Sequence, residues 1–325
     1  RWHLASYDVT IETLTDEPIG LDAITFTETR VTDDPAIQAL PSVSGDKIVW
    51  IDYRNCNNQI HAYDINTEVE TQISDCDYVG EPNIDNDKVV WTDGNIYVYD
   101  LNTNIETEII NGDTAFYTKI SGNKLAWQDN RISGDSNIFS YDLITGIETQ
   151  ITSDETDQTN ARISGDKIVW HDKRNSEDFW NPNNDIYLFD LNTGVESQIV
   201  GDTSNQLHPS ISIDKVVWED ERNGFGIKDI YLLDLNTGVE SQITDGASYN
   251  FHPSISGDRI VWVKSIDNMG SILYNIYVYD LNLGVKTLIS STDANVIIHP
   301  DIDGNRIVWE DIRNGNRDIY MATIN

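Results

Sequence analysis

Three His-Pro pairs are the residues of this sequence best suited to chemistry. They are His208-Pro209, His252-Pro253 and His299-Pro300, and each occupies the same place in a longer repeat. Elsewhere that place holds Leu40, Glu81, Tyr117 and Asn160, and we call all seven the mouth positions. Three imidazoles with a carboxylate across from them are a common ligand set for a transition metal. The alternative is a variable position at which His caps a strand by hydrogen bonding to a neighbouring loop, because no compact motif such as His-Glu-x-x-His is present.

Aromatic residues in loops form a second candidate site. Trp180, Phe179, Phe225, Tyr249 and Phe251 fall in segments that we expect to be exposed, on the same variable face as the mouth positions. Exposed rings stack on sugars or pack on a protein partner, whereas local packing is the simpler use of such residues. We predict a binding face composed of these five residues and five of the mouth positions, His208, His252, His299, Glu81 and Tyr117.

Five Asp-x-Arg-Asn hairpins suggest an anion receptor, but their recurrence favours a structural role. They contain the pairs Asp52/Arg54, Asp129/Arg131, Asp172/Arg174, Asp220/Arg222 and Asp311/Arg313. A residue type needed once per repeat is better explained as a clamp, in which the guanidinium bonds a neighbouring carboxylate. Acidic turns such as 301–305 lack the twelve-residue order and closing glutamate of a calcium loop. We therefore predict no required cofactor, with calcium or a transition metal as an optional one.

The remaining reactive groups form no familiar catalytic motif. The sequence has no Gly-x-Ser-x-Gly elbow and no glycine-rich phosphate loop. Cys56 and Cys76 are the only cysteines, and both fall in the first repeat. We predict a disulfide between them, which implies an oxidising compartment, with two reduced thiols as the alternative.

The elements that position these residues come from one repeat. Seven tryptophans mark it at intervals of 36 to 48 residues: Trp50, Trp91, Trp127, Trp170, Trp218, Trp262 and Trp309. That spacing is typical of four-stranded propeller blades. In the fourth repeat, alternation predicts strands over 161–164, 167–172, 185–190 and 195–200, joined by Gly-Asp and Asn-Thr-Gly turns. The sequence therefore predicts an all-β, seven-bladed propeller with four-stranded antiparallel blades.

The two ends of the chain are expected to close the ring. The last repeat ends after its third strand, and residues 27–32 match the missing outer strand, so the N-terminal strand should complete the last blade. We assign residues 24–325 to the propeller and 1–23 to an N-terminal extension. The extension is either a rim strand or lead-in, or a strand donated to a neighbouring subunit.

The charge and hydropathy of the sequence disfavour two classes of partner, nucleic acids and a membrane-spanning environment. With 55 acidic and 21 basic residues the formal net charge is -34, which disfavours binding to nucleic acid. No run of about 18 apolar residues is present that would span a membrane.

The phrases Ser-Gly-Asp-Lys-Ile-Val-Trp, Asp-x-Arg-Asn and Asp-Ile-Tyr-x-Tyr-Asp-Leu resemble the repeats of TolB-like (WD40-like PD40) propellers of archaeal and bacterial cell-surface proteins. The resemblance covers about residues 25 to 325. The resemblance implies the fold. Because the motifs are regular and no catalytic motif is present, we expect a non-enzymatic extracellular or cell-surface propeller that binds a protein partner or self-associates, with the N-terminal strand as one route to an oligomer. The alternative is a carbohydrate-binding or metal-assisted polysaccharide-cleaving enzyme with its site at the histidine-lined mouth.

Overall fold

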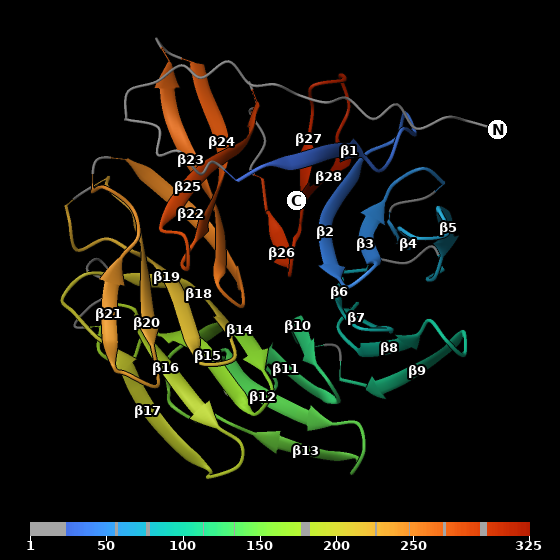
Figure 1. Ribbon diagram of the computed structural model, residues 1–325. Helices are drawn as coiled ribbons and strands as arrows, with labels where there is room; N and C mark the ends of the chain where they lie inside the picture. The colour runs from blue at the N-terminus through green and yellow to red at the C-terminus, as the bar shows by residue number, and fades with distance from the viewer. Residues whose placement is uncertain are drawn as a thin grey trace.

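The computed structural model of the chain is a ring of seven four-stranded antiparallel sheets around a central axis (Figure 1). It describes residues 24–55, 58–75, 79–112, 114–132, 134–176, 183–224, 226–246, 248–268, 271–292 and 298–325. Over these ranges every regular element is a strand, and no helix that could cross a membrane is found in them. The predicted fold class is confirmed. The extension 1–23 and the predicted residues Cys56, Cys76, Phe179, Trp180 and Phe225 lie outside the described ranges.

The blades follow the chain in order, each from the inner strand at the axis to the outer strand at the rim. Their strands are, for blade 1, β2 (Gln38–Ser44), β3 (Lys47–Asp52), β4 (Gln59–Asp64) and β5 (Val69–Gln72); for blade 2, β6 (Asn83–Asp85), β7 (Lys88–Thr92), β8 (Ile96–Asp100) and β9 (Ile105–Ile110); for blade 3, β10 (Ala115–Ser121), β11 (Lys124–Asp129), β12 (Asn137–Asp142) and β13 (Ile147–Gln150); for blade 4, β14 (Gln158–Ser164), β15 (Lys167–Asp172), β16 (Asp185–Asp190) and β17 (Val195–Val200); for blade 5, β18 (Gln206–Ser212), β19 (Lys215–Asp220), β20 (Asp229–Asp234) and β21 (Val239–Gln242); for blade 6, β22 (Tyr249–Ser256), β23 (Arg259–Asn268), β24 (Ser271–Asp280) and β25 (Val285–Thr292); and for blade 7, β26 (Asp301–Asp303), β27 (Arg306–Asp311), β28 (Asp318–Ile324) and β1 (Phe26–Arg30).

Alternation along the second strand explains how the blades pack. In β15, Ile168 and Trp170 join the core shared with blade 3, whereas Val169 points the other way into the core shared with blade 5. Both faces of each sheet are therefore buried, as the sequence predicts. The inner strand β14 begins at Gln158 rather than at the predicted residue 161, because a bulge lets pairing resume beyond it, at Thr159 opposite His171.

The Asp-x-Arg-Asn hairpins are structural clamps around the repeat tryptophans. In blade 4 the indole of Trp170 stacks on Tyr187 and donates to Asp172 Oδ2 at 2.9 Å. Arg174 Nη2 lies 2.6 Å from the same carboxylate oxygen, and its guanidinium covers Tyr187 at 4.1 Å from the ring centroid. Arg174 Nη1 also bonds Glu196 of the outer strand at 2.6 Å. One arginine thus ties three strands together.

The first and last strands close the ring, as predicted. β1 pairs with β28 from Phe26 opposite Ile324 to Arg30 opposite Tyr320. Arg30 also forms an ion pair with the buried Asp318 at 2.8 Å.

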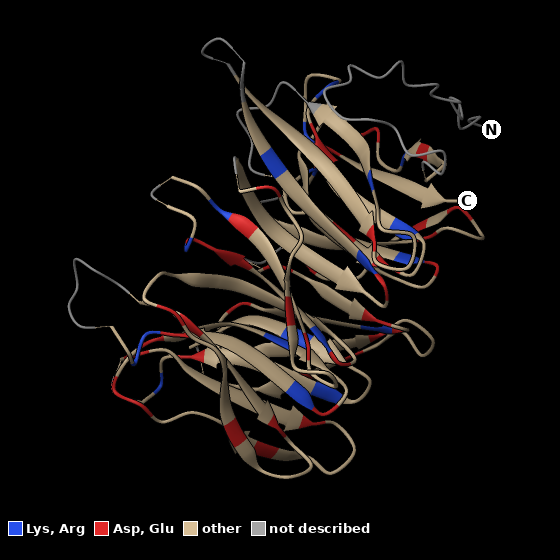
Figure 2. Cartoon of the chain, turned by 60° about the vertical axis from the view of Figure 1, so that its left-hand side comes forward, with Lys and Arg blue, Asp and Glu red and all other residues tan. Residues whose placement is uncertain are grey.

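A second circle of bonds runs round the end of the axis at which the inner strands finish. Each inner strand ends in Ser or Asp, whose side-chain oxygen accepts a hydrogen bond from a turn N–H of a neighbouring blade. The pairs, acceptor first, are Ser44/Asn86, Asp85/Gly122, Ser121/Gly165, Ser164/Ile213, Ser212/Gly257, Ser256/Gly304 and Asp303/Gly45. The repeated Ser-Gly phrase is therefore a joint between blades. Charged residues lie mostly at strand ends and in loops (Figure 2).

Candidate functional site

The mouth positions of five blades lie at a β-bulge in the inner strand. Leu40, Tyr117, Asn160, His208 and His252 have φ between 49° and 57°. At each of them the register against the second strand shifts. This left-handed conformation is unfavourable for residues other than glycine, and bulges commonly re-aim a side chain. Five blades therefore accept backbone strain at this position, and in four of them the strained residue lines the central cavity. The His-Pro phrase suggested that the histidine starts the inner strand, but in blades 5 and 6 the histidine lies inside that strand.

The bulge is held by the residue that follows the tryptophan of the preceding blade. The backbone N–H of the mouth residue donates to it in four places: Leu40 to Glu310 Oε1 at 2.7 Å, Asn160 to Gln128 Oε1 at 3.2 Å, His208 to His171 Nδ1 at 3.3 Å, and His252 to Glu219 Oε1 at 2.9 Å. Sequence reasoning missed this position. The signal for it is a polar residue directly after a repeat tryptophan, on a face where other repeats carry Ile51 or Val263.

The inner strands enclose a central cavity of about 590 Å³. Because alternate residues of a strand face the same side, its wall has layers. Six of the mouth positions form the first layer, from Glu81 to His299. Two residues further along each strand comes a second layer, which we call the middle layer, containing Ser42, Asn83, Lys119, Arg162, Ser210, Ser254 and Asp301. The serines and aspartates of the turn joints lie beyond it.

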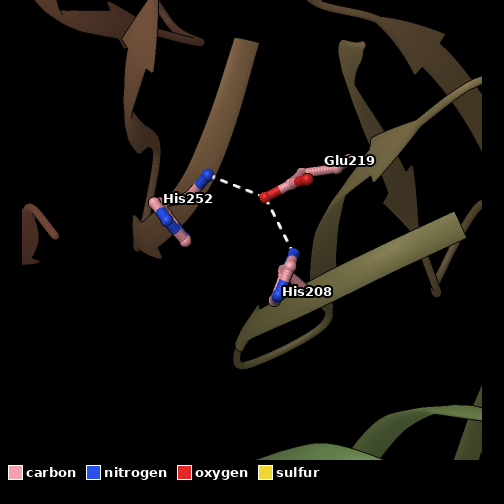
Figure 3. Close-up of side chains that lie close together, drawn as sticks. All are labelled: His208, Glu219 and His252. Carbon is pink, nitrogen blue, oxygen red and sulfur yellow. Dashed lines mark hydrogen bonds and ion pairs between the residues drawn. The ribbon is translucent and has the colours of Figure 1, made fainter. Parts of the chain in front are cut away.

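Three predicted histidines meet at the mouth, and a glutamate that was not predicted joins them. The ring centroids of His208 and His252 are 5.5 Å apart, and those of His252 and His299 are 4.4 Å apart. Glu219 Oε1 lies 2.9 Å from His208 Nδ1 and accepts the His252 N–H (Figure 3). Ligand atoms of His208, Glu219 and His252 all lie within 4.8 Å of one another.

Glu81, the carboxylate that the sequence predicts at this site, forms an ion pair with a lysine instead. Its Oε1 lies 2.5 Å from Lys119 Nζ. Glu219 thus replaces Glu81 as the carboxylate nearest to the imidazoles. Glu219 lies in β19, the second strand of blade 5. It is not part of the His-Pro repeat, so the sequence pattern did not identify it as a candidate ligand.

The protonation states at the mouth suit metal binding. Burial lowers the pKa of His252 to about 3, and burial likewise lowers the pKa of His299. Burial alone would raise the pKa of Glu219, but its contacts with His208 and Lys228 lower that pKa to about 2. The cluster therefore combines the neutral imidazoles of His252 and His299 with an ionised Glu219, and neutral imidazoles and ionised carboxylates are what a divalent cation requires of its ligands.

One nitrogen of the cluster has no hydrogen-bond partner. Nδ1 of His299 is buried and makes no hydrogen bond, whereas Nδ1 of His208 lies 2.9 Å from Glu219 Oε1. Buried polar atoms are nearly always satisfied, so the His299 nitrogen requires an explanation. A metal ion bound by the imidazoles would supply one, and the residues present fit it.

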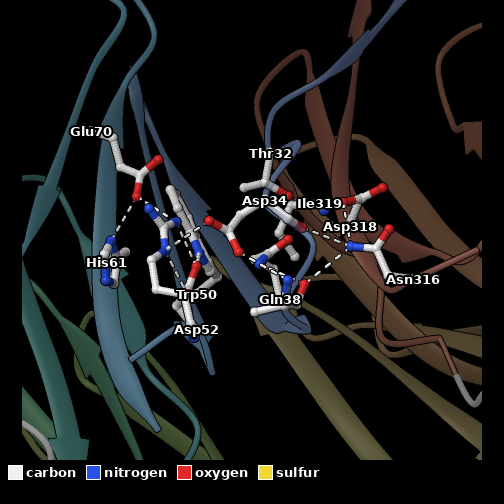
Figure 4. A network of polar contacts seen from close by, with 12 residues as sticks. Thr32, Asp34, Gln38, Trp50, Asp52, His61, Glu70, Asn316, Asp318 and Ile319 are labelled. Carbon is white, nitrogen blue, oxygen red and sulfur yellow. Dashed lines mark hydrogen bonds and ion pairs between the residues drawn. The ribbon is translucent and has the colours of Figure 1, made fainter. Parts of the chain in front are cut away.

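A second group of possible ligands, Asp52, His61 and Glu70 in blade 1, does not fit a metal (Figure 4). Arg54 Nη2 lies 2.7 Å from Asp52 and 2.6 Å from Glu70. This is the clamp of the other blades, with His61 stacked on Trp50 in place of tyrosine. The guanidinium already provides the positive charge there.

The predicted aromatic face is only partly present. Tyr117 and Tyr249 are 48% and 41% exposed, and Lys228 Nζ lies 5.2 Å from the centroid of the Tyr249 ring. Phe251 is 7% exposed and packs in the core between blades 6 and 7, so its predicted exposure is wrong. Its ring also contacts the ring of His252, with the two centroids 5.1 Å apart.

No family model matches the chain, and no curated protein matches it in sequence. Solved structures share its fold. An oligogalacturonate lyase in complex with manganese has a TM-score of 0.72 at 15% identity, covering 94% of this chain and 97% of the lyase. An oligogalacturonate lyase from Vibrio parahaemolyticus has a TM-score of 0.70 at 13% identity, with 92% and 94% covered. A putative TolB from Agrobacterium tumefaciens has a TM-score of 0.55 at 16% identity, with 82% and 98% covered. The fold is that of TolB-like propellers.

Proposed function

We propose that the mouth of the cavity is a divalent transition-metal site that serves the binding and cleavage of a carbohydrate. One observation carries the proposal. Imidazoles from three consecutive blades lie in contact beside Glu219, and the buried Nδ1 of His299 makes no hydrogen bond. Histidine with a carboxylate is a ligand set that zinc, manganese and similar ions accept. This is the alternative that the sequence left open.

The protein's own residues would hold the ion as follows. His208, His252 and Glu219 supply ligand atoms from blades 5 and 6, and His299 lies beside them in blade 7. Lys228 Nζ, 2.8 Å from Glu219 Oε2, fixes the carboxylate so that its other oxygen faces the imidazoles. His208 is about one third exposed, which leaves the cluster open to a ligand entering the mouth. A bound metal acts as a Lewis acid that polarises an oxygen of the substrate.

The fold shared with a lyase solved in complex with manganese supports this choice of chemistry. The exposed Tyr117 and Tyr249 support a sugar ligand, because aromatic faces stack on sugar rings. The non-enzymatic surface role, the extracellular location, the disulfide and self-assembly through the N-terminal strand stay predictions of the sequence.

Metal analysis of purified protein after incubation with Mn²⁺ or Zn²⁺ and desalting tests the proposal. We expect about one ion per chain in the wild type and none in His252→Asn. Asn is chosen because Asn160 occupies the same bulge in blade 4 at φ 57°, so the fold should persist. His61→Tyr is the matched control, since Tyr stacks on tryptophan at the same place in blade 4. It should keep the metal. A wild type without metal, or equal retention in His252→Asn, contradicts the proposal.

Cleavage is tested separately, by following new chain ends in a panel of neutral and acidic polysaccharides. Activity should require the added ion, and His252→Asn should lose it while His61→Tyr keeps it. Metal binding without cleavage of any substrate would reduce the site to a lectin.

A further inference from the structure

One arginine lacks the partner that every other described arginine has. Nine of the ten arginines in the described ranges lie within 4.0 Å of a carboxylate: Arg30, Arg54, Arg131, Arg174, Arg222, Arg259, Arg306, Arg313 and Arg317. Arg162 does not. Its one hydrogen bond, at 3.2 Å, is from Nη1 to the backbone carbonyl of Ala161. In a chain with 55 acidic residues, such an arginine needs a reason.

The place of Arg162 suggests the reason. It belongs to the middle layer of the cavity wall, where three other blades carry serine. On the neighbouring inner strand Lys119 takes the same place, and its residue is only 6% exposed. Burial and the nearby charge of Arg162 lower the pKa of Lys119, against the opposing effect of Glu81. Two cations therefore lie side by side on one wall of the cavity.

The carboxylates of this layer and the mouth are occupied by other groups. Glu81 is bound by Lys119 at 2.5 Å. Asp301 accepts hydrogen bonds from Ser42 Oγ at 2.9 Å and from Ser254 Oγ at 3.1 Å. A guanidinium has five N–H donors in a planar fork, and charges inside proteins are normally paired. Most of the fork of Arg162 is unused by the protein.

We propose that Arg162, with Lys119 beside it, binds the carboxylate of a ligand that enters the cavity from the mouth. Arginine suits this task because its fork matches the two oxygens of a carboxylate. A singly charged group is favoured over phosphate, because Glu81 and Asp301 in the same wall repel a second negative charge.

The position also sets the size of the ligand. Arg162 lies two residues along its strand from the mouth layer, which is about 7 Å of strand length. That distance is roughly the width of one sugar ring. If the proposed function holds, on which this identification of the ligand rests, the site selects an acidic sugar whose carboxylate reaches the middle layer while its other end remains near the histidines.

The test measures binding of D-galacturonate by calorimetry, first in EDTA and then with Mn²⁺, with D-galactose as the neutral match and inorganic phosphate as the competing anion. The variant is Arg162→Ser, which copies Ser42, Ser210 and Ser254 and should fold. Lys88→Ser removes a positive charge near the turn joints, at the start of β7, and is the control.

We expect galacturonate to bind the wild type at least ten-fold more tightly than galactose does, in both conditions. Arg162→Ser should weaken galacturonate at least ten-fold and leave galactose and Mn²⁺ binding unchanged, and Lys88→Ser should change neither sugar more than two-fold. Failure of galacturonate to bind, undiminished binding to Arg162→Ser, or tighter binding of phosphate overturns the inference. Arginine-dependent galacturonate binding by a protein that takes up no metal would instead overturn only the proposed function.

Discussion

Blades 5 and 7 contain the same three-residue arrangement, and only that of blade 5 belongs to the proposed metal site. Glu219 and Glu310 both follow a repeat tryptophan, are both 1% exposed, and both accept the N–H of the mouth residue in an adjacent blade. Each also has a cation placed just before the third strand. Lys228 lies 2.8 Å from Glu219, and Arg317 lies 3.1 Å from Glu310.

The electrostatics of the two glutamates nevertheless differ. Contacts with His208 and Lys228 overcome burial at Glu219 and lower its pKa to about 2. At Glu310 burial prevails over the Leu40 N–H and Arg317 and raises the pKa to about 7. Both carboxylates accept a backbone N–H, so the contrast comes from neighbouring side chains. Glu219 also contacts His208, whereas Glu310 faces the apolar Leu40 and the charge of Glu81 raises its pKa further. The repeat therefore fixes the position of the carboxylate, and the variable mouth residues set its pKa.

The largest expected effect comes from removing each carboxylate. Glu219→Ala leaves Lys228, 11% exposed, without its nearest partner and the His252 N–H without an acceptor, so the free energy of unfolding should fall by roughly 3–5 kcal/mol. Glu310→Ala removes a carboxylate that is costly to bury, and Arg317 is 31% exposed, so the loss should be about 1–2 kcal/mol. Urea denaturation at pH 7 of both variants measures the difference. Equal losses would mean that the two sites are equivalent.

The pH dependence of Glu310 gives the next effect. Its folded pKa of about 7 lies above the ordinary glutamate value of 4.5, so the folded state binds the proton more tightly and stability falls as pH rises between these values. Glu310→Gln removes this dependence and still accepts the Leu40 N–H, as Gln128 does for Asn160. The variant should gain about 3 kcal/mol over the wild type at pH 8 and almost nothing at pH 4.5. Denaturation curves at both pH values check this, and a gain that is the same at both would contradict it.

The smallest expected effect contrasts the turn joints of the same two blades. Blade 7 has Gly304 at φ 58°, whereas blade 5 has Ile213 at the same angle, 68% exposed. A β-branched residue is strained in this region, so Ile213→Gly should raise the free energy of unfolding by about 1 kcal/mol. Gly304→Ala should lower the free energy of unfolding. No atom lies within 4 Å of the added Cβ, so the cost comes from the left-handed backbone conformation alone. Thermal melting of both variants decides; destabilisation by Ile213→Gly would show that its side chain has a role of its own.

Much of the fold was predictable because the same pattern of strands and turns recurs in every repeat. The bounds of β15, β16 and β17 agree with those predicted, and so does the closure by β1, since turns and alternation are local signals. The start of β14 was not predicted correctly, because the bulge at Asn160 depends on a hydrogen-bond acceptor, Gln128, in the preceding blade.

The candidate site was predictable only in part for the same reason. The three histidines stand out because His-Pro repeats in sequence. Glu219 and Arg162 do not stand out, because their roles depend on their neighbours in space. Glu219 contacts His208 on the adjacent strand, and Arg162 has no carboxylate partner, which a sequence pattern cannot show. Phe251 was misplaced because its burial depends on residues of blade 7 that pack on it, such as Ile302, and these are distant in sequence.

The most direct test of the account titrates Mn²⁺ into the wild type, Glu219→Gln and Glu310→Gln and compares the affinities. Both substitutions keep a side-chain oxygen for the N–H of the next blade and remove one negative charge. The account predicts at least a ten-fold loss of affinity for Glu219→Gln and less than a two-fold change for Glu310→Gln. Equal effects of the two substitutions, or no binding by the wild type, would contradict it.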